Sequence, residues 1–400
     1  MKYHPIITQI ADNQTNLEQW LREAGQNKVL TVADTNTAIF ARTKNLLTLS
    51  PVPGNPDLVP DETAIGKIFV AAADAQVIIA VGSGTICDLV RYVSSRLGLP
   101  YYIVATAASM DGYTSSVAPL TVGGYKQTFP SSAPTGVIID PEIYNTASVK
   151  LTAAGFSDMM GKFTSVTDWE MEGLLFPEAG DFCPDMAKEM RKTAEDCYNS
   201  RNIMDALIAS GLIMQKVGNS KPASGSEHHL SHYWEMKALA GGKQPALHGA
   251  KVGVATLAAL QATEWLLEEE IDWNRKDKFD IDEWKNEINH CFGSITYDIQ
   301  LLWADESPIM RESMRTKIKS HWPKLQRILS QNNCLRHKLE EAIIDLGGPT
   351  TPAEIGVAPD TFYTGILHAN RLRRRFTVWR LLDLLGLLPK YAQKLSNQVK

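Results

Sequence analysis

The sequence predicts an α/β domain built on a parallel sheet, followed by an all-helical domain. Between residues 28 and 140, short apolar runs alternate with helical patterns, which is typical of a parallel sheet with helices on both faces. After about residue 150 the strand pattern fades and long helical patterns follow. A chain of 400 residues is long enough for two domains. We therefore expect domains at residues 1–148 and 149–400, with a ligand site in the cleft between them.

The elements of the first domain are short and are bounded by polar, Gly or Pro residues. The predicted strands are apolar runs dominated by Val, Ile and Tyr: 28–34, 76–81, 99–106 and 135–140. Two helical patterns lie between them, at 61–75 and 85–98. Eight helical patterns fill the second domain: 153–176, 184–215, 228–240, 249–271, 281–303, 308–330, 333–346 and 361–385.

Composition and charge exclude several classes of protein. The chain has 40 Lys and Arg against 45 Asp and Glu, a formal charge of -5, so it lacks the overall basic charge that nucleic acid or anionic lipid attracts. Its five cysteines form no C-x-x-C pair, which argues against a disulfide framework or a thiolate zinc site. The N-terminus lacks a signal-peptide pattern, and no apolar run approaches the roughly 20 residues that span a bilayer. We expect a cytoplasmic protein that binds neither nucleic acid nor membrane.

A glycine turn joins one predicted strand to the next helix. In AVGSGTICDLV the strand runs into Gly82-Ser83-Gly84, and the helix opens at Thr85. Glycines allow close backbone approach, and the free amides of a helix start attract phosphate. The spacing is not the G-x-G-x-x-G of dinucleotide-binding folds. The alternative is a tight turn in which Thr85 and Asp88 form a capping box.

A loop dense in hydroxyl groups follows the next predicted strand. VATAASMDGYTSS contains five Ser or Thr side chains around one carboxylate, Asp111. Because it follows a neighbouring parallel strand, it emerges at the same sheet edge as the glycine turn. Such a loop can bind ribose, an amide or substrate hydroxyls. The alternative is a loop whose side chains satisfy its own turns.

Four histidines and one aspartate suggest a metal site. His228, His229 and His232 fall in SEHHLSHYWE, and His248 opens a helical pattern. On a helix His228 and His232 share a face, while His229 points about 100° away. Asp158 in GFSDMMGK offers an oxygen ligand, and two histidines with one carboxylate would leave coordination positions open for catalysis. The alternative is a chance cluster of histidines and a carboxylate that only stabilises a helix start.

Five motifs together resemble one enzyme family. GSGTICD, TAASMDGYTSS, GFSDMMGK, SGSEHHLSH and LHGAKVG are similar to the sn-glycerol-1-phosphate dehydrogenases, of the superfamily that contains glycerol dehydrogenase, iron-type alcohol dehydrogenases and dehydroquinate synthase. The resemblance runs from about residue 28 to 386 and is greatest for the bacterial, metal-dependent branch. It implies a Rossmann-like N-terminal parallel-sheet domain and a dehydroquinate synthase-like all-α C-terminal domain.

The resemblance also implies a cofactor site for NAD, with NADP as a second option. A carboxylate at Asp34 would accept the ribose hydroxyls and would repel the 2′-phosphate of NADP. The remaining implied cofactor contacts lie in the glycine turn and the hydroxyl loop: Gly82, Ser83, Gly84, Thr85, Ile86, Thr106, Ser109 and Ser115.

The resemblance further implies metal and substrate residues. Asp158, His228 and His248 would hold one divalent metal per subunit, Zn²⁺ or Ni²⁺, although this donor set also accepts iron. His229 is expected not to be a ligand. Asp111 and His232 would be catalytic. The implied substrate contacts are Asp111, Lys126, Asp158 and His232, with Lys126 a candidate for the substrate phosphate.

The activity implied by the resemblance is the reversible, metal-dependent reduction of dihydroxyacetone phosphate to sn-glycerol 1-phosphate by hydride transfer, in phospholipid biosynthesis, by a homodimer or higher homo-oligomer. Two alternatives stay open: a glycerol dehydrogenase-like enzyme acting on an unphosphorylated polyol, and a nucleotide-binding regulator without catalysis. Dehydroquinate synthase chemistry needs several cationic side chains, and few stand near these motifs.

Overall fold

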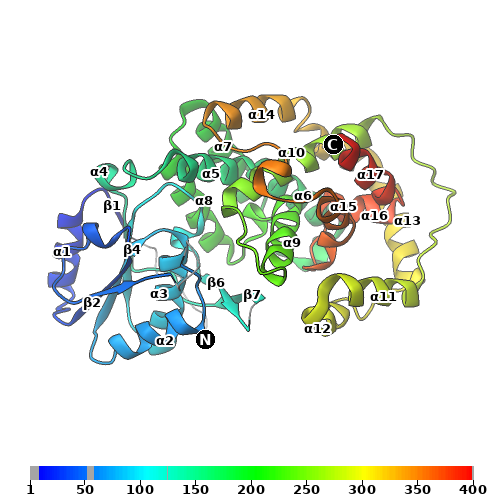
Figure 1. The fold of residues 1–400 in the computed structure, drawn as a ribbon. Helices are drawn as coiled ribbons and strands as arrows, with labels where there is room; N and C mark the ends of the chain where they lie inside the picture. The colour runs from blue at the N-terminus through cyan, green and yellow to red at the C-terminus, as the bar shows by residue number, and fades with distance from the viewer. Residues whose placement is uncertain (1–8, 52–57, 124, 399–400) are drawn as a thin grey trace. The chain divides into compact units, whose positions relative to one another are not determined.

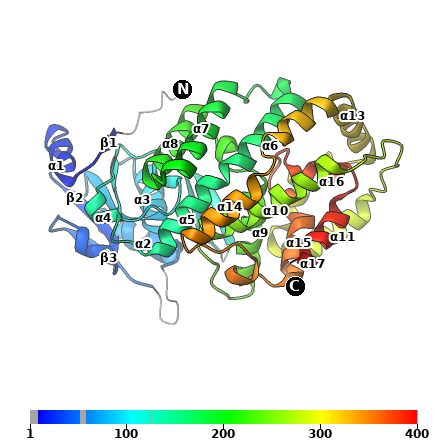
Figure 2. The same cartoon turned by 90° about the horizontal axis from the view of Figure 1, so that it is seen from above.

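The computed structural model describes residues 9–51, 58–123 and 125–398 (Figures 1 and 2). The chain divides into two compact units. The first contains Met1–Met159 and Thr193–Asn219, and the second contains Met160–Lys192 and Ser220–Lys400. The functional boundary expected between residues 148 and 149 stays a prediction, because compactness alone assigns no function to either unit.

A six-stranded parallel sheet forms the centre of the first unit (Figure 1). Its order is β1-β8-β5-β4-β2-β3. The strands are β1 (Gln9–Ala11), β2 (Val29–Asp34), β3 (Leu46–Leu49), β4 (Val77–Gly82), β5 (Tyr101–Ala105) and β8 (Gly136–Ile138). Every residue of β4 and β5 is buried, as expected for central strands covered on both faces. The carboxyl ends of the neighbouring strands β4 and β5 therefore carry the glycine turn and the hydroxyl loop at one sheet edge.

Helices and one hairpin complete the first unit. Helix α3 packs on β4, and α8 packs on the short turn that follows β5. The antiparallel hairpin pairs β6 (Val117–Val122) with β7 (Tyr125–Pro130). The helices are α1 (Gln14–Glu23), α2 (Glu62–Ala71), α3 (Gly84–Leu97), α4 (Pro141–Tyr144), α5 (Val149–Met160) and α8 (Ile203–Val217). Helix α7 (Pro184–Ser200) runs across the division between the units.

The described part of the second unit is helical. Its core contains large buried side chains such as Trp234, Trp379 and Leu325. The helices are α6 (Lys162–Leu175), α9 (Ser226–Ala240), α10 (His248–Glu268), α11 (Ile281–Phe292), α12 (Thr296–Leu302), α13 (Pro308–Ser330), α14 (Leu335–Asp345), α15 (Pro359–His368), α16 (Val378–Leu384) and α17 (Leu388–Gln398). Helices α9 and α10 pack against each other. Among residues 9–51, 58–123 and 125–398, no helix has the length and apolarity needed to cross a membrane.

The predicted fold class is confirmed, with corrections to individual elements. All four predicted strands are present as β2, β4, β5 and β8. The prediction missed β1, β3 and the β6–β7 hairpin. It also joined helices that the structure separates: the pattern 153–176 is interrupted at Gly161, and the pattern 184–215 at Arg201, whose φ of 59° is left-handed. A left-handed residue cannot continue a right-handed helix, so this second pattern forms two helices.

Candidate active site

The glycine turn leaves a helix start without an acidic or side-chain cap. Strand β4 ends at Gly82, and α3 begins at Gly84. Ser83, the N-cap residue, makes no side-chain capping hydrogen bond, and the first turn contains no acidic residue. The capping box considered for Thr85 and Asp88 is absent, since Asp88 pairs with Arg91. The amides of this turn are therefore available to a phosphate group.

Gly82 is required by the packing of strand against helix. A Cβ at this position would lie 2.6 Å from the Cβ of Ile86, a distance that real side chains do not tolerate. Gly84 differs, because a Cβ there would meet only the Cγ of Met110, at 3.9 Å. The first glycine thus permits close helix–strand packing, whereas the second leaves open the space in front of the helix start.

Two glycines position the hydroxyl loop. A Cβ on Gly155 of α5 would lie 2.0 Å from the carbonyl oxygen of Ala108, and one on Gly211 of α8 would lie 2.0 Å from Oγ1 of Thr114. Both helices therefore approach the loop so closely that only a residue without a Cβ fits at these positions. The fully buried Arg91 adds a further connection, because its guanidinium donates to the carbonyl oxygens of Gly112 and Tyr113. Sequence reasoning missed Arg91, although its position on the helix after the glycine turn was a usable signal.

The loop's predicted ligand residues have different environments. Thr106 and Ser109 are buried, and the amide of Thr106 donates to the carbonyl of Gly82 at 3.2 Å. Ser115 satisfies its own turn, since its hydroxyl accepts from the amide of Val117 at 3.1 Å. The alternative of a self-satisfying loop therefore holds for Ser115. Its contact with cofactor stays a prediction, as do those of Thr106 and Ser109.

Asp111 and Asp158 are both buried and lie near each other. The amide of Asp111 donates to Oδ2 of Asp158 at 3.2 Å, while Oδ2 of Asp111 accepts from the hydroxyl of Ser210 at 2.9 Å. Helix α5 carries Asp158, whose side chain has no exposed surface. This geometry holds both carboxylates in fixed positions.

Asp34 ends strand β2. Its Oδ1 accepts from the amides of Asn36 and Thr37, each at 2.8 Å, and from the hydroxyl of Thr37 at 3.0 Å. Within the described residues Oδ2 accepts no hydrogen bond, and the side chain is half-buried. One carboxylate oxygen thus orders the turn after β2, and the other faces no protein donor.

His228 and His248 face each other through the same ring atom. His228 lies in the first turn of α9, and His248 is the first residue of α10. Their Nε2 atoms are 3.2 Å apart. Nδ1 of His228 lies 2.8 Å from Oε1 of Glu227, and because a carboxylate only accepts, Nδ1 carries the proton. In this tautomer of the neutral ring the lone pair of Nε2 points toward His248, an arrangement in which two histidines can share a cation.

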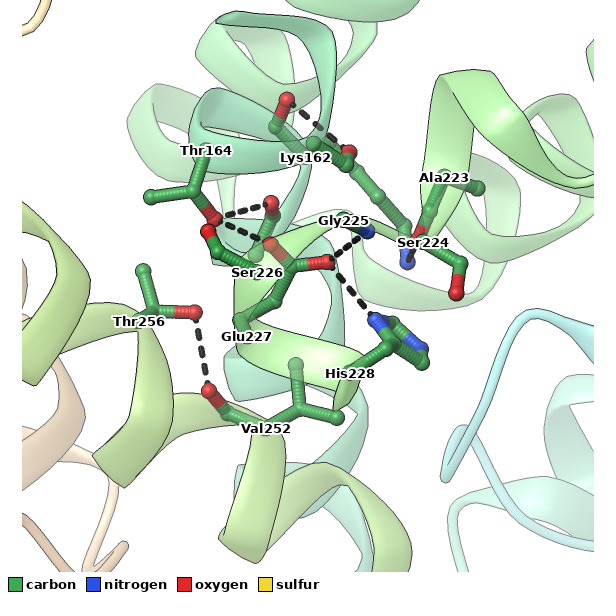
Figure 3. Close-up of polar contacts among 12 residues, drawn as sticks. Lys162, Thr164, Ala223, Ser224, Gly225, Ser226, Glu227, His228, Val252 and Thr256 are labelled. Carbon is green, nitrogen blue, oxygen red and sulfur yellow. Dashed lines mark hydrogen bonds and ion pairs between the residues drawn. The ribbon is translucent and has the colours of Figure 1, made fainter. Parts of the chain in front are cut away.

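Glu227 is the residue that fixes His228 (Figure 3). It has no exposed surface, and it also accepts from the amide of Gly225 and the hydroxyl of Thr164, both at 2.6 Å. Burial alone would raise the pKa of Glu227, but the hydrogen bonds from His228, Gly225 and Thr164 together hold it below its usual value. Sequence reasoning missed Glu227, although a carboxylate directly before a candidate ligand histidine was a signal for it.

A second carboxylate, Asp168, anchors the start of α9. Its two oxygens accept from the amides of Ser226, at 2.6 Å, and Val378, at 2.8 Å. Burial and the charge of Glu227 raise the pKa of Asp168 well above its usual value. Asp168 thereby joins α9 to the start of α16, and it holds the helix that carries Glu227 and His228.

His229 and His232 differ from the facing pair. His229 is fully buried, and neither of its ring nitrogens has a hydrogen-bond partner among the described residues. Burial, followed by the charges of Arg373 and Arg375, lowers the pKa of His229 well below its usual value, so the ring is neutral. His232 is half-buried, and its ring centroid lies 6.0 Å from that of His228 and 5.8 Å from that of His248.

Three of these side chains have the composition of a metal centre. One donor atom each from Asp158, His228 and His248 lies within 4.8 Å of the other two. His229 and His232 are not in this group. Two imidazole nitrogens and a carboxylate oxygen suit Zn²⁺, Ni²⁺ or iron, and a three-ligand shell leaves a position open for substrate. Lys126, predicted to contact the phosphate, lies in β7, and its side chain is outside the described residues.

Comparison with known proteins identifies the family. A family model described as iron-containing alcohol dehydrogenase matches residues 10–148. The glycerol-1-phosphate dehydrogenase [NAD(P)+] of Bacillus licheniformis is 32% identical, over 97% of this chain and 92% of the relative. That of Geobacillus thermodenitrificans is 31% identical, over 94% of this chain and 91% of the relative. The chain belongs to the glycerol-1-phosphate dehydrogenase family. The resemblance drawn from the five motifs and the predicted oxidoreductase class are thereby confirmed.

Solved structures share the fold of this glycerol-1-phosphate dehydrogenase family member. An iron-containing alcohol dehydrogenase from Corynebacterium glutamicum matches with a TM-score of 0.58 at 13% identity, over 97% of this chain and 94% of the other. A glycerol dehydrogenase from Schizosaccharomyces pombe matches with a TM-score of 0.54 at 17% identity, over 98% and 91%. At these identities the matches show the fold alone. They confirm the predicted architecture of a parallel-sheet region followed by a helical region.

Proposed function

We propose that this protein catalyses the reversible, NAD(P)-dependent reduction of dihydroxyacetone phosphate to sn-glycerol 1-phosphate. The relatives that define its family are named for glycerol 1-phosphate and NAD(P)+. The observation that carries the proposal is the facing pair His228 and His248, whose Nε2 atoms lie 3.2 Å apart. With Glu227 behind His228, this arrangement supports a metal-assisted reaction at a ketone or alcohol oxygen.

The cofactor residues of the proposal lie in the first unit. The uncapped start of α3, residues 82–86, would bind the cofactor pyrophosphate through backbone amides. Asp34 would accept the adenosine ribose hydroxyls through Oδ2, and its charge favours NAD over NADP. Thr106, Ser109 and Ser115 would complete the contacts.

Asp158, His228 and His248 would hold one divalent metal per subunit, which we propose to be Zn²⁺ or Ni²⁺. When bound, the metal polarises the substrate oxygen and the nicotinamide supplies or accepts the hydride. Glu227 keeps Nδ1 of His228 protonated and directs Nε2 toward the metal position. Asp111, fixed by Ser210, would contact the substrate.

His232 would move the proton. It lies one helical turn after His228, with its ring about 6 Å from both ligand rings by centroid distance. In the reducing direction His232 would deliver a proton to the substrate oxygen at C2. In the oxidising direction it would accept that proton. A positioned histidine suits this role because its ordinary pKa lies near neutrality.

The test is turnover of purified protein with NADH and dihydroxyacetone phosphate, followed by enantiomer-resolved analysis of the product. We expect oxidation of NADH and formation of glycerol 1-phosphate, with far lower kcat/KM for unphosphorylated dihydroxyacetone. Equal kcat/KM for the two ketones would favour the polyol dehydrogenase alternative. Absence of turnover in metal-loaded protein would favour the regulator. We also propose a cytoplasmic location and a homodimer or higher homo-oligomer, to be tested by fractionation and light scattering.

A further inference from the structure

Three cationic side chains converge on one loop of the second unit. This loop, residues 220–225, comes directly before helix α9. Lys162, which is fully buried, donates to the carbonyl of Ala223 at 3.2 Å. Arg375 donates to the hydroxyl of Ser220 at 2.8 Å and also to the carbonyl of Ser224. Figure 3 shows Lys162 and this loop beside the first turn of α9, where Glu227 and His228 lie.

Arg373 differs from both arginines that follow it in the chain. Arg374 forms an ion pair with Asp305 at the surface, and Arg375 is held by the acceptors of the loop. Arg373 makes a single hydrogen bond, from Nη1 to Oγ of Ser224, and at 3.4 Å it is long. Within the described residues no carboxylate lies within 4.0 Å of its guanidinium. Since a guanidinium has five N–H donors, most of them have no protein acceptor.

The charge of Arg373 is also poorly compensated. Burial, and then the neighbouring positive charge of Arg375, lowers the pKa of Arg373 to about 10. The side chain therefore stays protonated at neutral pH, although it is partly removed from water. A partly buried cation without a paired anion is unfavourable, and a bound anion with several oxygens would relieve this. Arg375, whose hydrogen bonds are taken by the loop, adds positive charge without competing for the anion.

Arg373 contacts a residue that comes just before the candidate metal ligand His228 in the chain. Its one hydrogen-bond acceptor, Ser224, precedes His228 by four residues. Burial, followed by the charges of Arg373 and Arg375, lowers the pKa of His229, the residue directly after His228. Arg373 thus lies beside the start of α9, the helix whose first turn carries His228. A three-carbon phosphate ester carries its dianion only a few bonds from its ketone, so one such molecule suits a metal position and a nearby arginine.

We propose that Arg373 binds the phosphate group of the substrate and is a specificity-determining residue for phosphorylated over unphosphorylated ketones. This inference rests on the proposed function. It assigns the phosphate to a guanidinium that can donate two parallel hydrogen bonds to phosphate oxygens. It also explains how an enzyme with a polyol-dehydrogenase fold would require a phosphate ester.

The test compares Arg373→Gln, Arg373→Lys and Arg374→Gln with the wild type in the metal-loaded enzyme. The measured quantity is the ratio of kcat/KM for dihydroxyacetone phosphate to kcat/KM for dihydroxyacetone, which does not depend on the fraction of active protein. Arg373→Gln should lower this ratio roughly 10–100-fold, as expected for loss of a charge-assisted hydrogen-bonded pair. Arg373→Lys should give a ratio between those of the wild type and Arg373→Gln, because lysine keeps the positive charge but cannot form the bidentate hydrogen bonds of a guanidinium. Arg374→Gln, the matched control, should equal the wild type.

Inhibition by inorganic phosphate provides a second readout. Its inhibition constant should rise in Arg373→Gln and should be unchanged in Arg374→Gln. If the wild type prefers the phosphate ester but Arg373→Gln keeps the wild-type ratio and phosphate inhibition, Arg373 does not bind phosphate and the proposed function still stands. If the wild type does not turn over dihydroxyacetone phosphate, the proposed function and this inference fail together. If Arg373→Gln does not fold, a wild-type ratio in Arg373→Lys would overturn the inference.

Discussion

The two units carry different kinds of chemistry. In the first unit the proposed cofactor contacts are mostly backbone amides and small hydroxyls, and the close packing of strand and helix depends on the absence of a Cβ at Gly82. In the second unit the chemistry lies in charged and titratable side chains held by buried hydrogen bonds, such as Glu227 and His228. Substitutions that add atoms should therefore disturb the glycine turn of the first unit. Substitutions that remove a side chain should disturb the hydrogen-bonded network of the second unit.

The largest expected effect is loss of the bound metal. His228→Ala and His248→Ala should each lose bound metal, and turnover should fall on the order of 10⁴-fold because several kcal/mol of charge stabilisation disappear. EDTA should abolish wild-type turnover, and Zn²⁺ or Ni²⁺ should restore it. His229→Ala is the matched control and should keep the metal, as measured by elemental analysis. Metal loss in His229→Ala alone would contradict the ligand assignment.

Substitution of His232 tests whether this histidine contributes to catalysis without binding the metal. His232→Ala should keep native metal content and NADH affinity, while kcat falls on the order of 10²–10⁴-fold, the usual contribution of a positioned acid or base. Metal per subunit and kcat are measured on the same preparation. Loss of metal would make His232 a ligand, and native turnover would remove it from the proton path.

Glu227 tests whether the buried network matters for the ligand it supports. Glu227→Ala should weaken metal affinity roughly 10–100-fold, the usual effect of losing the partner of a ligand histidine. Glu227→Gln keeps an oxygen acceptor for Nδ1 of His228, so its metal affinity should fall less than that of Glu227→Ala. Competition with a chromogenic chelator measures both affinities without turnover. Equal affinities in Glu227→Ala and the wild type would show that His228 does not depend on this carboxylate.

The first unit should respond to an added methyl group. Gly82→Ala places a Cβ 2.6 Å from the Cβ of Ile86, so the free energy of unfolding should fall by about 1–2 kcal/mol, within the range for overpacking. Gly84→Ala is the matched control for stability, because its nearest contact would be at 3.9 Å. Urea unfolding compares the two. Equal stabilities would show that the β4–α3 junction adjusts freely.

Sequence patterns predicted the centre of the sheet better than its edges. The central strands β4 and β5 are continuous apolar runs, because burial on both faces demands them. Strands β1 and β3 lie at the two edges and are partly exposed, so neither requires the fully buried apolar run that marks the inner strands. The β6–β7 hairpin did carry a signal, the Gly-Gly pair at 123–124, which apolar runs alone do not reveal.

The candidate site shows a similar contrast between residues that are close in the sequence and residues that only the fold brings together. Spacing along one helix placed His228 and His232 on one face, and the family resemblance implied Asp158, His228 and His248 as the metal ligands. The cations around the loop 220–225 come from Lys162, Arg373 and Arg375, which only tertiary structure brings together. For this reason the sequence suggested few cationic side chains near the motifs, and Lys126 was the one candidate for the phosphate.

The order in which the chain visits the two units has a consequence for its synthesis. The first unit includes residues 193–219, and α8 within that segment packs Gly211 against the loop at Thr114. This unit therefore cannot be completed when its last strand, β8, leaves the ribosome. It must wait for roughly 80 further residues, or several seconds at about 5–20 residues per second. During that interval the surface that α8 later covers is exposed.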